Sequence, residues 1–286
     1  MPLPATELTF GVTLAVLAAA LLHAGWNALL KSAPGGDPLL DMAAVVAGSS
    51  AVAMVVAPFV GFPDAAAWKF AAASTAIHFG YYVTLSQAYR TGDLSFAYPL
   101  MRGTAPLLTT VLGIAFLGEW PTVQTATGIA LISLGIVSIA FLRRGRHPPA
   151  ATAWALTNAA IIGLYTLVDG AGARASTNPA AYVVWLSVLE GIPFLGWVLL
   201  RRGPASLGYL RRGWRRGLAG GAASLAAYGI VLWAMTLAPV AAVTALRETS
   251  VLFAALIGAY WLKEGFTLPR LAGAASVVLG IAALKL

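Results

Sequence analysis

Long apolar stretches separated by short polar or Gly/Pro-rich joints make up most of the chain. Ten of them are about as long as a helix that crosses a bilayer core, which takes roughly 20 residues. They cover 9–30, 39–60, 66–89, 94–117, 122–142, 151–172, 179–200, 217–237, 240–262 and 267–285. They are about twice as long as a membrane β-strand and lack its apolar/polar alternation. The pattern therefore predicts an all-α membrane protein with ten transmembrane helices.

The composition agrees with a membrane protein. Of the 286 residues, 59% are hydrophobic and 10% are charged, which is not the composition of a water-soluble domain. The chain has no cysteine, so disulfides and thiolate metal sites are excluded. Its three histidines are scattered and lack zinc-ligand spacing. We expect neither a metal nor a cofactor.

Basic residues gather in the joints that follow odd-numbered spans. Of the 18 lysines and arginines, 13 lie in these joints, three lie in the even joints and termini, and two lie inside spans. Cytoplasmic loops carry an excess of Lys and Arg, so the odd joints are predicted to be cytoplasmic and both termini to face the other side. Beside membrane spans, the arginine-rich stretches at 143–147 and 201–216 mark a membrane face more simply than a nucleic-acid site.

The second half of the chain repeats the first at a shift of 145 positions. MRGTAPLLTTVLGIAFLGE at 101–119 then lies over LRETSVLFAALIGAYWLKE at 246–264, with Arg102 on Arg247 and Glu119 on Glu264. Between 102 and 136, 12 of the 35 positions are identical. The aligned Arg, Glu and Gly pairs carry the case, because aliphatic matches are frequent among membrane segments. The alignment predicts an internal duplication.

The duplication divides the chain into two five-helix units. Residues 1–142 form the first repeat, 143–150 a basic linker, and 151–286 the second repeat. Because five is odd, the two repeats must cross the membrane in opposite senses, as an inverted repeat. Such repeats are typical of transporters, whose halves rock to open a central site alternately to either side.

Three motifs carry a resemblance to a known family. FLGE…T…G at 116–128, WLKE…T…G at 261–273 and HAGWNALLK at 23–31 resemble the drug/metabolite transporter superfamily, EamA type. The resemblance covers essentially the whole chain and implies a ten-helix basket around a central cavity. It is strongest toward bacterial exporters of aromatic and other amino acids, which implies the bacterial inner membrane. The first span lacks the glutamate on which the small multidrug members depend, which argues against their proton-coupled mechanism.

Polar side chains inside spans are costly in lipid and therefore point to function. Helical spacing places His78 with Tyr82, Tyr98 with Arg102, and Tyr165 with Asp169 on single helix faces. Rings, hydroxyls and cationic groups suit an organic solute with a flat apolar part and polar ends. The candidate substrate-binding residues are His78, Tyr82, Tyr98, Arg102 and Tyr165. Alternatively, these residues are structural: tyrosines of the bilayer interface, and a histidine that bonds between helices, the role favoured for His23 and Asn27.

The two intramembrane arginines lie at corresponding depths in the two repeats, about 12 Å into span 4 and 10 Å into span 9. Each could meet a solute carboxylate, or an intramembrane acid, in one state and lose it in the other. The candidates for gating or coupling are Arg247, Asp169, Glu190 and Glu248. Permanent pairing that holds helices together is the alternative. Pro99 and Pro106 predict a kink or break in span 4.

The preferred function is an exporter or facilitator of small amphipathic metabolites that works by alternating access, with amino acids, aromatic ones included, implied by the resemblance. The alternative is a proton-coupled exporter of drugs or organic cations, for which Asp169 or Glu190 could supply the buried acid. The chain shows no nucleophile–base pair and no phosphate-binding loop, so no enzyme is predicted. The expected partners are the solute and the bilayer, without nucleic acid. The duplication is compatible with a monomer.

Overall fold

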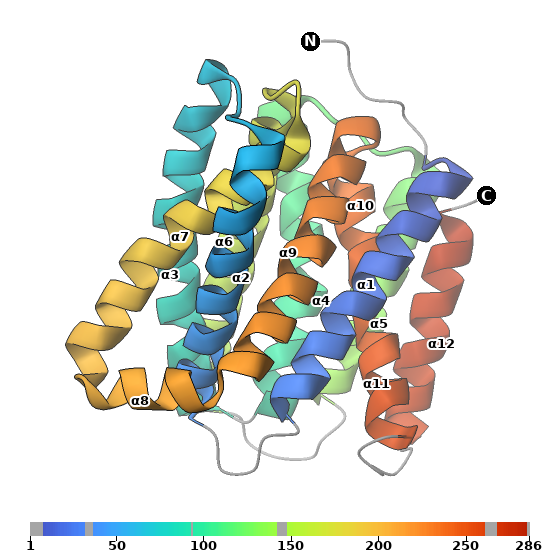
Figure 1. Ribbon diagram of the computed structural model, residues 1–286. Coiled ribbons are helices and arrows are strands. Elements are labelled where there is room, and N and C mark those ends of the chain that lie inside the picture. The colour runs from blue at the N-terminus through green and yellow to red at the C-terminus, as the bar shows by residue number, and fades with distance from the viewer. Residues whose placement is uncertain (1–7, 32–36, 93, 142–147, 261–267, 285–286) are drawn as a thin grey trace.

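The protein is a bundle of helices (Figure 1), and its structure is a computed structural model that describes residues 8–31, 37–92, 94–141, 148–260 and 268–284. The helices are α1 (Phe10–Lys31), α2 (Pro38–Val60), α3 (Trp68–Thr91), α4 (Leu94–Leu112), α5 (Val123–Phe141), α6 (Pro149–Arg174), α7 (Pro179–Arg202), α8 (Ala205–Arg212), α9 (Trp214–Leu237), α10 (Val240–Arg247), α11 (Ser250–Tyr260) and α12 (Leu268–Ala283). A 3₁₀ turn, η1 (Ala65–Ala67), precedes α3, and a π turn, η2 (Gly113–Leu117), extends α4. The all-α prediction is confirmed.

Within the described part of the chain, seven helices are long and apolar enough to cross a membrane. They are α1, α2, α4 with η2, α5, α6, α7 and α9. The other three predicted spans appear as α3, as the pair α10 and α11, and as the 16-residue α12. A membrane protein with several spanning helices is thus confirmed, and the number ten is not.

The break in a span occurs in the second repeat and not in the first. α4 continues through Pro99 and Pro106, so the span is not broken there, and the alternative, a kink, stays a prediction. Proline is tolerated inside membrane helices because neighbouring groups satisfy the backbone that it frees. The stretch 240–262 is interrupted instead between Arg247 and Ser250, where α10 ends and α11 begins.

The two halves of the chain pack face to face through small residues. α2 contacts α9, α5 contacts α12, and α3 contacts α6. A Cβ on Gly221 of α9 would lie 2.1 Å from the Ser49 backbone nitrogen of α2, and one on Gly48 would lie 2.0 Å from the Gly217 oxygen. Such close backbone contact is how membrane helices associate, because burying apolar side chains gains little in lipid.

Adding one methyl group to the α2–α9 contact is expected to destabilise the bundle. Gly221→Ala should lower the midpoint of thermal unfolding in detergent, since overpacking typically costs about 1–3 kcal/mol. Gly196→Ala on α7 is the matched control, because a Cβ there meets nothing within 4 Å. It should leave the midpoint unchanged or raise it slightly, as alanine favours helix. Equal midpoints for both variants would contradict the packing argument.

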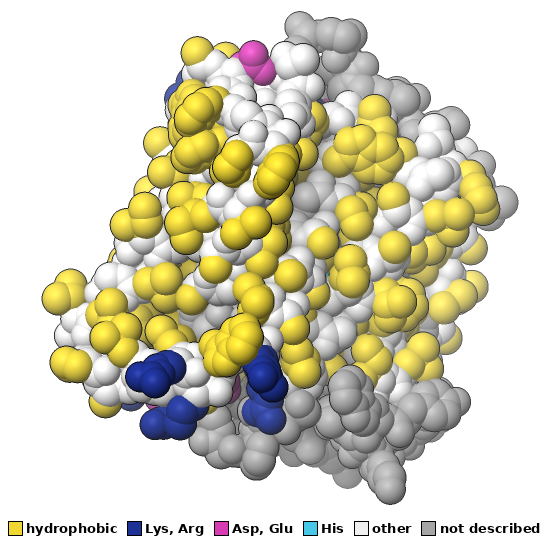
Figure 2. Space-filling model, viewed as in Figure 1, with side chains coloured by type: hydrophobic (Ala, Val, Ile, Leu, Met, Phe, Trp, Pro, Cys, Tyr) yellow, Lys and Arg dark blue, Asp and Glu magenta, His cyan; other side chains and the backbone are white. Residues whose placement is uncertain are grey.

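The surface of the bundle is apolar on its sides and basic at one end. Figure 2 shows hydrophobic side chains along the sides, and lysines and arginines gathered beside α8. Phe59 and Leu200 are among the large apolar residues that remain exposed, as on a surface that faces lipid. The exposed basic residues near α8 are Arg201, Arg202, Arg211, Arg212, Arg215 and Arg216. We call this the basic end; α1 begins and α12 ends at the opposite end (Figure 1).

Candidate functional site

A polar cavity of about 130 Å³ lies inside the bundle, between the two halves. Helices α1 to α4 contribute to its wall from the first half, and α6, α7, α9 and α10 from the second. Its polar and aromatic lining includes His23, Trp26, His78, Tyr81, Tyr82, Arg102, Tyr165, Glu190, Tyr228 and Arg247.

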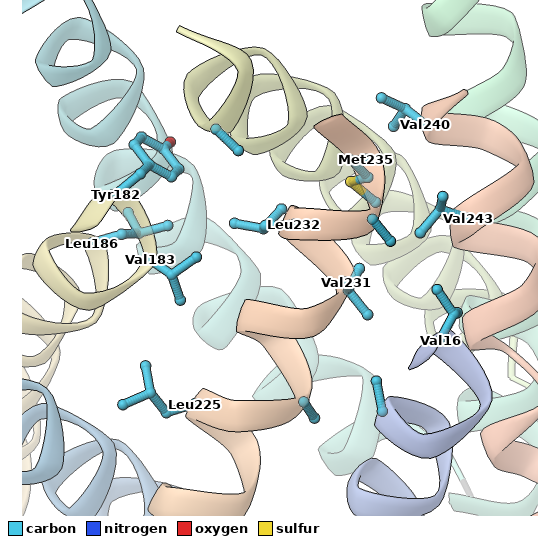
Figure 3. Close-up of a cluster of buried hydrophobic side chains, with 14 of the residues drawn as sticks. Val16, Tyr182, Val183, Leu186, Leu225, Val231, Leu232, Met235, Val240 and Val243 are labelled. Carbon is cyan, nitrogen blue, oxygen red and sulfur yellow. The ribbon is translucent and has the colours of Figure 1, made fainter. Parts of the chain in front are cut away.

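The cavity lies nearer to the basic end than to the opposite end. Trp26 and Met42 belong to its wall and lie within about 8 Å of the ends of α1 and α2 that face the basic end. Toward the opposite end the space is filled by buried apolar side chains of α1, α7, α9 and α10 (Figure 3). This apolar plug includes Val16, Tyr182, Leu186, Val231, Leu232, Met235, Val240 and Val243. The plug separates the cavity from the opposite end.

One part of the site is an arginine cluster with excess positive charge. Arg102 of α4 and Arg247 of α10 are 6% and 5% exposed, and Glu248, with its side chain between them, is fully buried. The Arg102 Nε lies 2.7 Å from Glu248 Oε2, and the Arg247 Nη2 lies 3.6 Å from Glu248 Oε1. Two guanidinium groups thus share one carboxylate, which leaves one positive charge uncompensated among the residues that the structure describes.

The arginine cluster also has unused hydrogen-bonding groups. Despite the short distances, neither arginine donates to Glu248 with hydrogen-bond geometry, and among the described residues Nε and Nη2 of both have no hydrogen-bond acceptor. The buried hydroxyls of Thr249 and Ser250, at the start of α11, are also without partners in the described structure. Buried charges without hydrogen bonds are unfavourable. A second anion at this helix start would satisfy these donors.

A second part of the site is an acidic cluster of Glu190, Asp169 and His78. The His78 Nδ1 lies 3.0 Å from Glu190 Oε1 and 3.0 Å from the Ser74 hydroxyl. Both His78 and Glu190 line the cavity. Glu190 supplies the carboxyl group of this cluster that lies in the cavity wall.

Asp169 lies one layer behind the cavity wall. It is fully buried and accepts hydrogen bonds from the hydroxyls of Tyr182, at 2.9 Å, and of Tyr228. Tyr228 itself lines the cavity, so its hydroxyl connects the cavity wall to the carboxylate. Two hydroxyl donors, and no described arginine or lysine, hold this carboxylate.

Aromatic rings form an apolar wall around the acidic cluster. The ring centroids of His78 and Tyr165 are 4.1 Å apart, and Tyr81 meets Tyr165 edge-on at 5.7 Å. Tyr82 stacks on Phe194 at 4.2 Å, which fixes its ring beside the cavity. Rings arranged this way offer flat apolar surface, and their faces attract cations.

The structure brings most of the predicted site residues together. Those in the cavity wall are His78, Tyr82, Arg102, Tyr165, Glu190 and Arg247. Glu248 joins the two arginines, and Asp169 is reached through Tyr228. Tyr98 is not in the wall and packs against an apolar cluster of α3, α4 and α6 instead. Transport roles for all of these remain predictions.

Four of the polar and aromatic wall residues were missed by reasoning from the sequence: His23, Trp26, Tyr81 and Tyr228. His23 was expected to bond between helices, but it lines the cavity, and Asn27 donates to the His23 carbonyl within the same helix. Tyr81, three positions after His78 on the same helix, was not among the candidate residues. Tyr228 could have been found, because it is a lone tyrosine in a run of small residues on α9. A single large polar ring among small side chains is a signal of a lined space.

Comparison with known proteins gives a family and a fold. The model of the EamA-like transporter family matches the chain twice, over residues 9–141 and 150–286. A solved structure titled "Crystal structure of protein" is similar, with a TM-score of 0.77, 18% identity and 96% of each chain covered. At that identity the likeness shows the fold alone. A comparison with curated proteins finds no match.

Proposed function

The chain belongs to the EamA-like transporter family, and we propose that it carries small zwitterionic metabolites, in particular amino acids including aromatic ones, across the bacterial inner membrane. The observation that supports this proposal is the charge pattern of the cavity. An arginine cluster with one excess positive charge and a cluster that contains the carboxyl groups of Glu190 and Asp169 contribute to the same cavity wall. A solute that carries both an ammonium and a carboxylate group complements both.

The wall residues suit the parts of an amino acid separately. Its carboxylate would bind Arg102 and Arg247, because the planar guanidinium group matches a carboxylate with two parallel hydrogen bonds. Its ammonium group would bind Glu190, beside the ring faces of Tyr165 and His78. An apolar or aromatic side chain would pack on the tyrosine rings. Each charged group of the solute would then be paired inside the bundle.

The charge of the cavity favours a zwitterionic metabolite over an organic cation. The second candidate, a proton-coupled exporter of organic cations, draws support from the buried carboxylates Asp169 and Glu190. The arginine cluster opposes it, because two guanidinium groups in the wall repel a solute that is only cationic.

The proposed transport cycle uses ten membrane crossings in two inverted five-helix repeats. The basic end would face the cytoplasm, where membrane proteins concentrate Lys and Arg. The cavity lies nearer to that end and the apolar plug closes the other, so this state would take solute from the cytoplasm. Rocking of the repeats would then open the plugged end and release the solute outside.

Flux through the purified protein in liposomes tests the proposed function. We expect saturable flux of labelled phenylalanine, tryptophan, threonine or methionine above that of protein-free liposomes. A cationic dye should move no faster than in the protein-free control. Repeating the assay with a pH gradient separates a proton-coupled exporter, whose flux responds, from a facilitator, whose flux does not. Flux of the dye without flux of any amino acid would favour the second candidate.

A further inference from the structure

A buried ion pair joins the two halves of the chain at the end opposite the basic end. Glu119 follows η2 in the first half, and Arg174 is the last residue of α6 in the second half. Their side chains are 6% and 12% exposed, and Arg174 Nη1 contacts Glu119 Oε1 directly. The cavity wall includes neither residue, so the proposed solute contacts do not account for the pair.

The remaining polar atoms of this pair hold the joint between α9 and α10. Arg174 Nε donates to the Met235 carbonyl at 2.7 Å, and its Nη2 donates to the Ala238 carbonyl at 3.1 Å. Glu119 Oε2 accepts from the Val240 backbone N–H at 2.8 Å. These backbone groups lie at a helix end and a helix start, where no helical partner serves them. A buried ion pair is favourable under such conditions, because hydrogen bonds satisfy its other atoms.

The FLGE motif explains how Glu119 reaches this position. Gly118 has φ +67°, a left-handed conformation that glycine adopts without strain. The Gly118 and Glu119 N–H groups both donate to the Gly113 carbonyl, which closes the π turn η2 and ends the helix. Glu119 is therefore the second residue beyond the helix, directly after Gly118, at the joint between halves. The corresponding Glu264 lies outside the described residues.

The apolar plug lies directly under the ion pair. Met235 and Val240 have their side chains in the plug, and their backbone groups are the ones that Arg174 and Glu119 bind. Figure 3 shows both residues beside the α9–α10 joint. The plug cannot separate along this joint while Glu119 of the first half and Arg174 of the second half both hydrogen-bond to the same backbone segment.

The other side-chain hydrogen bonds that described residues make between the halves at this end belong to a different contact. Asn178 donates to the Val60 carbonyl, Trp185 Nε1 donates to the Gly61 carbonyl, and the Thr177 N–H donates to Asp64. The Thr177 N–H lowers the pKa of the Asp64 carboxyl. These hydrogen bonds hold the C-terminal end of α2 against the N-terminal end of α7.

An ion pair and a hydrogen bond also hold α2 against α7 and α8 at the basic end. There Arg202 pairs with Asp37, and the Tyr209 hydroxyl donates to Asp41. A contact held at both ends stays together when either end opens. An opening at the plugged end must therefore pass the Glu119–Arg174 pair.

We propose that Glu119 and Arg174 form a latch that holds the plugged end closed and separates when the cavity opens to that side. The inference rests on the alternating access in the proposed function. The pair lies near the end of the bundle, so water can reach both charges once the halves part, and the open state need not leave either charge buried. Removing one charge weakens the closed state alone and should shift the protein toward the open state.

Labelling of an introduced cysteine tests the latch without a substrate. The chain has no cysteine, so Ser224→Cys in the cavity wall and Ala180→Cys at the plugged end each give a single reactive thiol. A membrane-impermeant thiol reagent is applied to oriented vesicles, and Ala180→Cys identifies the side that displays the plugged end. From that side, Ser224→Cys should react slowly. Adding Glu119→Gln or Arg174→Gln should raise its rate about tenfold, a typical coupling between sites.

Asp64→Ala is the matched control, because it also removes a bond between the halves at this end, but in the α2–α7 contact. It should leave the labelling rate of Ser224→Cys unchanged. If either single variant fails to fold, Glu119→Gln with Arg174→Gln leaves no unpaired charge and gives the same test. Unchanged labelling in folded latch variants would make the pair a permanent clamp and overturn the proposal. Increased labelling in a protein that moves none of the tested solutes would support the latch and count against the proposed function.

Discussion

Replacing Arg102 by alanine is expected to reduce amino-acid flux by about 100-fold or more. The change removes the nearer partner of Glu248 and cancels the excess positive charge of the arginine cluster. Each hydrogen bond between the guanidinium group and the solute carboxylate is worth about 1.5–3 kcal/mol, two are lost, and each 1.4 kcal/mol is about a factor of ten. The solute carboxylate also loses one of its two cationic partners. The measurement is the initial rate of labelled phenylalanine flux in liposomes that hold equal amounts of folded protein.

Two further variants separate binding from folding. Arg102→Lys keeps the charge but lacks the planar pair of donors, so it should retain part of the flux with weaker apparent affinity. Arg211→Ala removes an exposed arginine from α8 and should match the wild type. Wild-type flux in Arg102→Ala would show that the carboxylate binds elsewhere.

Replacing Glu190 by glutamine is expected to weaken the binding of the ammonium group. A hydrogen bond to a charged group is worth about 1.5–3 kcal/mol, so flux of phenylalanine at low concentration should fall about 10- to 100-fold. Flux of 3-phenylpropanoate, which has the ring and the carboxylate but no ammonium group, should fall much less. The variant should therefore lose the preference for the zwitterion that we expect of the wild type.

The comparison of the two solutes distinguishes a binding role of Glu190 from a structural one. Asp41→Asn is the control, because this carboxylate accepts from Tyr209 at the basic end and is absent from the cavity wall. It should affect neither flux. If Glu190→Gln lowers the flux of both solutes equally, Glu190 serves mainly to hold His78 in place.

The helices were predictable from the apolar pattern, because a backbone in lipid must bond within its own helix. The interruption of the apolar stretch 240–262 was not predictable from the sequence, since no proline or glycine lies between Arg247 and Ser250. It lies where Arg247 and Glu248 meet Arg102 from another helix, a contact far apart in the sequence. The prolines of α4 did not break the helix, because a surrounding bundle can satisfy the backbone groups that they free.

The charged members of the site were predictable because charges inside membrane spans are costly and rarely incidental. The partners of these charged residues were not predictable, since spacing along one helix does not tell which residues of other helices lie opposite. Helical spacing placed Tyr98 with Arg102 on one face, yet only Arg102 reaches the cavity wall. It also could not show that His23 and Tyr228 complete the wall from α1 and α9.

The zwitterion proposal is tested most directly by calorimetric binding of three related solutes to the purified wild-type protein. Phenylalanine has both charges, 3-phenylpropanoate only the carboxylate, and phenethylamine only the ammonium group. Because the arginine cluster and the acidic cluster should each bind one charge, phenylalanine should bind at least about tenfold more tightly than either analogue. Binding of phenethylamine as tight as that of phenylalanine would contradict this account and point to an exporter of organic cations.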